Sequence, residues 1–133
     1  MYYLAFVYDY PGGFGFVAPD VEGFTAHVET DDFSAAVSEA RKVLAAHLTA
    51  LLDAGGQLPR ARSIKDLVAQ PDLRPDFEEA ITTVMLPALV SSGRTKRVNI
   101  SLDENTIQLI DQAARERGLT RSAYVAEAAR EFV

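Results

Sequence analysis

The sequence has no cysteine and only two histidines among its 133 residues. Without cysteine the chain can form neither a disulfide nor a thiolate metal site, and this composition fits a reducing compartment. No apolar run approaches the roughly eighteen residues that a membrane-spanning helix needs, and the N-terminus lacks the basic region and cleavage site of a signal peptide. We therefore expect a cytoplasmic protein that uses no metal, no cofactor and no membrane.

Charge is distributed unevenly along the chain. The content of 48% apolar and 24% charged residues is typical of a soluble globular protein with one ordinary domain or two small ones. Residues 1–93 hold six Lys or Arg against thirteen Asp or Glu, a net charge of −7, whereas residues 94–133 hold seven against six, a net charge of +1. Residues 87–96, PALVSSGRTK, have the composition of a linker. We therefore expect a domain at 1–90, a linker at 91–95 and a second domain at 96–133.

The second domain begins with a short strand predicted at residues 97–102, where polar and apolar residues alternate. The outward side chains of this strand are Arg97, Asn99 and Ser101, and the inward ones are Val98, Ile100 and Leu102. A single strand leaves its backbone hydrogen-bonding groups and its apolar row without a partner. The strand therefore predicts pairing with a second copy of the chain.

Two short helices are predicted after this strand. Asp103 can cap the first and Gly118 can end it, and Thr120 can cap the second. Each helix has one apolar side, formed by Ile107, Ile110, Ala113 and Ala114 in the first and by Tyr124, Val125, Ala128, Ala129 and Phe132 in the second. About forty residues bury too little surface to be stable alone. A dimer solves this, because two strands can form an antiparallel ribbon over a core shared by four helices.

This strand-helix-helix segment resembles a ribbon-helix-helix DNA-binding domain of the MetJ and Arc type. The resemblance implies that the ribbon enters the major groove and that Arg97, Asn99 and Ser101 contact base edges. It also implies phosphate contacts at the strand entrance and at the start of the second helix, by Lys96, Thr120, Arg121 and Ser122. The segment departs from the common pattern at Asp103, where many members have proline, and at Ala123, where an acidic residue would complete a capping box. The alternative is a dimerisation module that binds no nucleic acid; the three-part layout favours DNA binding.

The first domain is predicted to be α+β, with a βββα(α)β order and an antiparallel sheet. Strands are expected at 2–8, 14–18, around 24–28 and near 80–86, a long helix at 33–53 and a short helix at 64–69. The first strand, YYLAFVY, is apolar on both faces. The long helix can cover one face, and the other face can be covered either by residues 57–76 or by another chain.

In order and length this half is similar to the partly degraded ribonuclease H-like domain of HicB antitoxins. The resemblance rests on the opening strand with its PGGFGF hairpin, the PDVEGF segment, the helix DDFSAAVSEARKVLAAHLTALLDAG and the LPRARS stretch after it. It implies that the domain binds and blocks a small basic toxin, HicA, which cleaves messenger RNA. It also implies that the ribbon-helix-helix homodimer, with a higher oligomer left open, represses its own operon through operator DNA.

Catalysis is not expected from this sequence. A working ribonuclease H site needs several carboxylates around two metal ions, and Asp9, Asp20 and Glu22 are too few. His27 and His47 have no nucleophilic residue near them in the sequence. The glycine-rich segment at residues 12–15 predicts a hairpin turn rather than a phosphate-binding loop. The main hypothesis is an antitoxin and autorepressor with no catalytic residue. The alternatives are a repressor whose first domain senses a ligand or oligomerises without a toxin, and an active nuclease.

Overall fold

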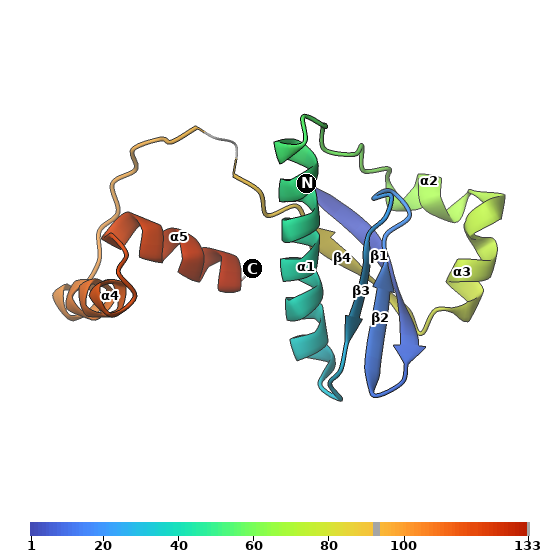
Figure 1. Cartoon of the computed structure of the whole chain (residues 1–133), viewed down its shortest axis with the longest axis horizontal. Coiled ribbons are helices and arrows are strands. Elements are labelled where there is room, and N and C mark those ends of the chain that lie inside the picture. The colour runs from blue at the N-terminus through green and yellow to red at the C-terminus, as the bar shows by residue number, and fades with distance from the viewer. Residues whose placement is uncertain (92–93, 133) are drawn as a thin grey trace. The chain divides into compact units, whose positions relative to one another are not determined.

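A computed structural model describes residues 1–91 and 94–132 of the chain (Figure 1). The chain forms two compact units, Met1–Val90 and Ser91–Val133, which we call unit 1 and unit 2. Unit 1 contains the sheet and most of the buried side chains, whereas unit 2 is helical. Among the described residues, no helix is both long and apolar enough to cross a membrane.

Unit 1 is built on a four-stranded antiparallel sheet in the order β3-β2-β1-β4. Its strands are β1 (Tyr2–Tyr10), β2 (Gly13–Val17), β3 (Thr25–Val28) and β4 (Thr82–Pro87). The predicted mixed α+β architecture with an antiparallel sheet is therefore confirmed, with strand ends shifted by one or two residues. β1 lies between β2 and β4, as expected for a strand that is apolar on both faces.

One face of the sheet is covered by the long helix α1 (Phe33–Asp53), as Figure 1 shows. The helix begins where predicted, because a carboxylate oxygen of Asp32 accepts the N–H of Ser34 at 3.0 Å. Leu44 and Leu48 of α1 are buried against the same face of β1 as Tyr3, Ala5 and Val7. This cluster is the main core of the protein, and alternate positions of β1 contribute to it.

The other face of the sheet is covered by the same chain. Residues 64–79 form α2 (Ile64–Val68), a 3-10 turn η1 (Pro71–Leu73) and α3 (Arg74–Glu79). Leu67 is buried on Leu4 and Phe6, and the ring of Phe77 meets that of Phe6 edge-on with centroids 4.8 Å apart. The sequence left open whether residues 57–76 or another chain covers this face, and in the structure the same chain covers it. No third helix was predicted here, because six residues are too few for a periodic signal.

Unit 2 contains α4 (Glu104–Glu116) and α5 (Arg121–Glu131). The predicted caps are confirmed: Asp103 accepts the N–H of Asn105 at 3.0 Å and Thr120 accepts that of Ala123 at 3.2 Å. Gly118 follows α4 with φ of +66°, a conformation that favours glycine. Residues 94–103 belong to no helix or strand, so the strand predicted at 97–102 is not formed in this single-chain structure.

Candidate functional site

The side chains predicted to contact DNA are accessible in unit 2. Lys96, Arg97, Asn99 and Ser101 are exposed, and so are Thr120, Arg121 and Ser122 at the start of α5. The apolar row of the predicted strand is exposed as well, with Ile100 66% accessible. Ala114 is the only buried side chain among the described residues of this unit. Unit 2 therefore presents an apolar surface that one copy of the chain does not cover.

Arg121 has a partner that the sequence did not predict. Its Nε and one Nη donate to the two carboxylate oxygens of Asp111 on α4, both at 2.8 Å. The hydrogen bond from Arg121 lowers the pKa of Asp111, and the same bond raises the pKa of Arg121. A residue ten positions earlier on another helix carries no local sequence signal, so only the α4-α5 packing could reveal this pair. Three of the five guanidinium N–H donors stay available for a phosphate.

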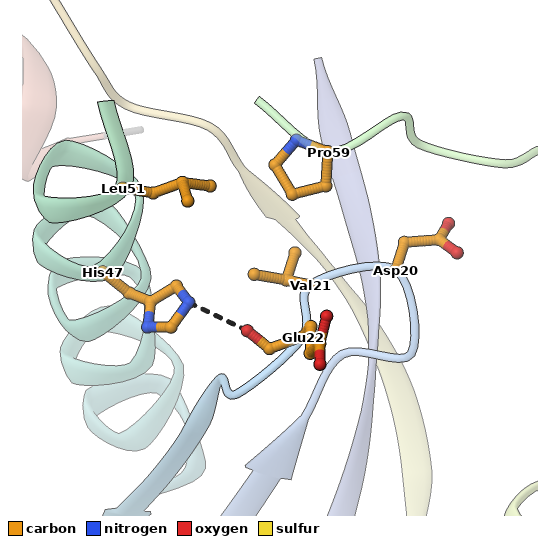
Figure 2. A pocket seen from close by; sticks show the side chains of 6 residues that line it. All are labelled: Asp20, Val21, Glu22, His47, Leu51 and Pro59. Carbon is orange, nitrogen blue, oxygen red and sulfur yellow. Dashed lines mark hydrogen bonds between the residues drawn. The ribbon is translucent and has the colours of Figure 1, made fainter. Parts of the chain in front are cut away.

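Unit 1 has a shallow, open hollow of about 320 Å³ beside the C-terminal half of α1. Figure 2 shows the six residues that line it, which come from the β2-β3 loop, α1 and the segment after α1: Asp20, Val21, Glu22, His47, Leu51 and Pro59. His47 Nε2 lies 3.1 Å from the carbonyl oxygen of Glu22 and holds this loop against α1. The hollow thus joins three segments that are far apart in the sequence.

Asp20 ties the β2-β3 loop to the segment after α1. Its carboxylate accepts the backbone N–H of Arg62 at 2.8 Å and Nε of the same residue at 2.6 Å, and the side chain is only 5% exposed. Nearby, Tyr3 donates to the carbonyl oxygen of Pro59 at 2.6 Å. Burial raises the pKa of Tyr3, and the neighbouring Asp20 raises it further. These bonds fix residues 59–62 against the sheet, and they assign Asp20 a structural role.

The carboxylates considered for a nuclease do not converge. Asp9 is exposed on β1, Asp20 binds Arg62, and in Figure 2 the carboxylate of Asp20 points away from that of Glu22. Across residues 1–91 and 94–132, no group of three or more His, Cys, Asp or Glu side chains could hold a metal ion.

Both histidines pack against aromatic rings. His27 stacks on Tyr10 with ring centroids 4.2 Å apart and an interplanar angle of 6°, and the ring of His47 meets that of Phe24 edge-on with centroids 6.2 Å apart.

The turn before β2 is a hairpin, in which Gly12 has φ of +81° and a side chain at Gly13 would collide with the carbonyl of Val28. The two histidines and these glycines pack against the sheet or shape its turns.

We expect Asp20→Ala to destabilise unit 1 by about 1 to 3 kcal/mol, because it leaves the partly buried N–H and guanidinium of Arg62 without their charged acceptor. Urea unfolding followed by tyrosine fluorescence measures this change, since four of the five tyrosines lie in unit 1. Glu22→Ala is the matched control, because Glu22 is in the same loop and none of the described hydrogen bonds uses its carboxylate. Equal stability of the two variants would contradict the structural role of Asp20.

Several solved structures are similar to this chain over most of its length. The crystal structure of the Burkholderia pseudomallei antitoxin HicB has a TM-score of 0.53 and 24% identity, and the match covers 100% of this chain and 98% of that one. The crystal structure of antitoxin HicB3 has a TM-score of 0.54 and 27% identity over 100% of this chain and 98% of that one. A chain of the HicA3 and HicB3 toxin-antitoxin complex has a TM-score of 0.52 and 24% identity over 68% of this chain and 99% of that one. The fold is therefore that of an antitoxin.

The family follows from a match to the sequence itself. The model of the HicB-like antitoxins of bacterial toxin-antitoxin systems matches residues 2–129, and the chain belongs to this family. An uncharacterised 14.9 kDa protein from the rep-hol intergenic region of Haemophilus phage HP1 (strain HP1c1) is 29% identical over 101 residues, which are 75% of this chain and 71% of that protein. The predicted kinship with HicB antitoxins is confirmed.

Proposed function

We propose that this antitoxin binds and neutralises a small, basic, HicA-like toxin that cleaves messenger RNA, and that it represses its own operon. Neutralisation is assigned to a ribonuclease H-like domain at residues 1–90, and operator binding to a ribbon-helix-helix domain at 96–133 after a linker at 91–95. The observation that carries the proposal is the family match over residues 2–129, because it spans both units. The likeness to a chain of a solved toxin-antitoxin complex supports the toxin partner.

Charge supports the assignment of the toxin to unit 1. Residues 1–93 have a net charge of −7, which complements a basic toxin and accelerates its association. The protein acts in this proposal by binding and not as an enzyme, in keeping with carboxylates that do not converge on a metal site in the described residues. We place this activity in the cytoplasm, where both messenger RNA and the operator are found.

Operator binding is assigned to a homodimer of unit 2. Val98, Ile100 and Leu102 form the inner row of the ribbon, while Arg97, Asn99 and Ser101 read bases. Lys96, Thr120, Arg121 and Ser122 contact phosphates. The exposed apolar row followed by two capped helices supports this arrangement. Arg121 contributes its remaining N–H donors, and Asp111 offsets part of its charge.

We expect Arg97→Ala to weaken binding to the cognate operator by about 1 to 3 kcal/mol, because the variant loses a bidentate contact with guanine. Nonspecific binding should change less. Fluorescence anisotropy with the operator and with a scrambled duplex, both at the same salt concentration, measures the difference. Arg117→Ala is the matched control, since Arg117 is a basic residue of the same unit that packs its guanidinium 5.6 Å from the ring centroid of Tyr124. An equal loss of affinity for both duplexes would show that Arg97 does not contact a base.

The alternative function is a repressor whose unit 1 senses a ligand or oligomerises and which has no toxin partner. The product of the neighbouring reading frame distinguishes the antitoxin from this alternative repressor. A basic protein of well under a hundred residues that copurifies with this chain on coexpression supports the antitoxin, and no such partner favours the sensor.

A further inference from the structure

One ion pair in unit 2 joins the two helices at the point where α5 begins. Arg121 is the first residue of α5, and Asp111 lies ten positions earlier on α4. Nε and one Nη of Arg121 donate to the two carboxylate oxygens of Asp111, both at 2.8 Å. Two parallel hydrogen bonds fix the plane and the direction of the guanidinium group, which a single bond would leave free to rotate. The long side chain of Arg121 is therefore held in one orientation before any ligand binds.

The opposite edge of this guanidinium group faces away from Asp111. It carries the three N–H groups that the ion pair leaves unused. This edge can bind a second anion in the same plane, because the guanidinium group is planar and its donors form a rigid fork. The side chain of Arg121 is 59% exposed, so a large anion can reach it. Arg121 also stands at the N-terminus of α5, where the helix dipole favours negative charge.

The carboxylate of Asp111 adds little repulsion at this place. The hydrogen bond from Arg121 lowers the pKa of Asp111, and the charge of Arg115 lowers it further, so the carboxylate is ionised at neutral pH. Its single negative charge is set against two guanidinium groups, those of Arg115 and Arg121. A phosphate group that approaches Arg121 therefore still meets a net positive charge.

We propose that Asp111 is a positioning residue for operator binding, which directs the free edge of Arg121 toward a phosphate group of the DNA backbone. This inference rests on the binding of the operator that we proposed for unit 2. In the complex, the guanidinium group of Arg121 joins the carboxylate on one edge to the phosphate on the other. The arginine side chain loses its rotational freedom when the unit folds and not when it binds DNA, so the phosphate contact is stronger.

A role of Asp111 through charge alone has the opposite consequence for DNA affinity. An acidic residue near DNA repels the phosphates, so its removal should tighten binding if Asp111 only neutralises Arg121. If Asp111 positions Arg121, its removal should weaken binding, because the DNA must then order the freed side chain. The sign of the change in affinity therefore separates the two roles.

Asp111→Ala in the full chain should weaken DNA binding about tenfold, since each of the two copies in the proposed dimer loses one ordered side chain. Fluorescence anisotropy measures this affinity with a duplex that carries the promoter region of the chain's own operon. In a chain that already has Arg121→Ala, the same substitution should not weaken binding, because Asp111 then has no guanidinium group to hold. Glu116→Ala is the matched control, because Glu116 is an exposed acidic residue of the same helix that accepts a hydrogen bond from Gln112, and it should not weaken binding.

The salt dependence of binding is a second measurement, which a purely structural role of Asp111 would not change in this way. For Asp111→Ala, the plot of log K against log salt concentration should become shallower by about 1.8, because two phosphate contacts per dimer are lost at about 0.9 each. Asp111→Asn keeps the shape of the side chain and one acceptor oxygen, so it should lose less affinity than Asp111→Ala. Arg121→Lys should lose nearly as much affinity as Arg121→Ala, because an ammonium group has no second edge.

The outcomes distinguish this role from operator binding itself. Tighter binding by Asp111→Ala with a steeper salt dependence would overturn the positioning role, and so would an equal change of affinity with and without Arg121. In both cases the parent chain still binds the duplex and the proposed operator binding stands. A parent chain that does not bind the duplex would overturn both proposals.

Discussion

Replacing Ile100 with lysine is expected to abolish operator binding. Ile100 is 66% exposed in the single chain, where a lysine is harmless, but it lies in the middle of the inward row of the proposed ribbon. Pairing would bury two ammonium groups, one from each copy, in a shared apolar core with no carboxylate of the row to pair with. Burial of an unpaired charge costs several kcal/mol per group, which is comparable with the stability of a small domain. The ribbon should therefore not form.

Two measurements test this result. Gel shift with the operator should show at least a hundredfold loss of affinity, and amide exchange at residues 97–102 should become as fast as in an unstructured peptide. Leu109→Lys is the matched control, because Leu109 is 68% exposed in the same unit but lies outside the predicted apolar stripe of α4. It should retain operator binding. An Ile100→Lys chain that binds the operator as tightly as the parent would refute the intertwined dimer.

A chain ending at Val90 is expected to neutralise the toxin as well as the full antitoxin does. Both hydrophobic clusters of unit 1 are formed by residues within 3–90, so the unit can close its core without unit 2. The cut belongs after Val90 and not at the end of β4, because Ala88 bonds to Met1 and Val90 packs on the core. Coexpression with the gene of the HicA-like toxin should restore colony counts by several orders of magnitude over toxin alone.

Two further chains make the growth assay decisive. Residues 91–133 alone should give no protection, and a full chain with Leu44→Asp should also fail, because that carboxylate would lie in the main core where Leu44 is fully buried. The Leu44→Asp chain keeps unit 2 intact, so its failure to protect would assign neutralisation to unit 1. Loss of protection by a folded, expressed 1–90 fragment would mean that neutralisation requires unit 2.

Local sequence patterns were sufficient for most of the secondary structure. Asp103 and Thr120 cap the helices that they are predicted to cap, and Asp32 and Ser63 cap α1 and α2 in the same way, because a cap is a contact between residues two or three positions apart. The continuous apolar run at residues 2–8 likewise predicts a strand that is buried on both faces. The kinship with HicB antitoxins was also readable, because it rests on the order of such segments along the chain.

Contacts between residues that are far apart in the sequence could not be predicted from local patterns. Asp20 was considered as a nuclease ligand, and its bond to Arg62, 42 positions away, assigns it to structure. Arg121 is predicted to contact a phosphate, and nothing in the sequence indicated that its guanidinium also binds Asp111. In each case the partner lies on a different segment of the chain, and no periodic pattern in the sequence relates the two residues.

The sequence by itself determined the two-part organisation, the helix caps, the strand positions of unit 1 and the antitoxin family, since all of these depend on near neighbours or on segment order. Only the tertiary structure decided that residues 64–79 cover the second face of the sheet, and that β4 is an edge. The physical reason is that strand order and face coverage follow from which apolar surfaces meet in space. Many pairings share one alternating pattern, and packing selects among them.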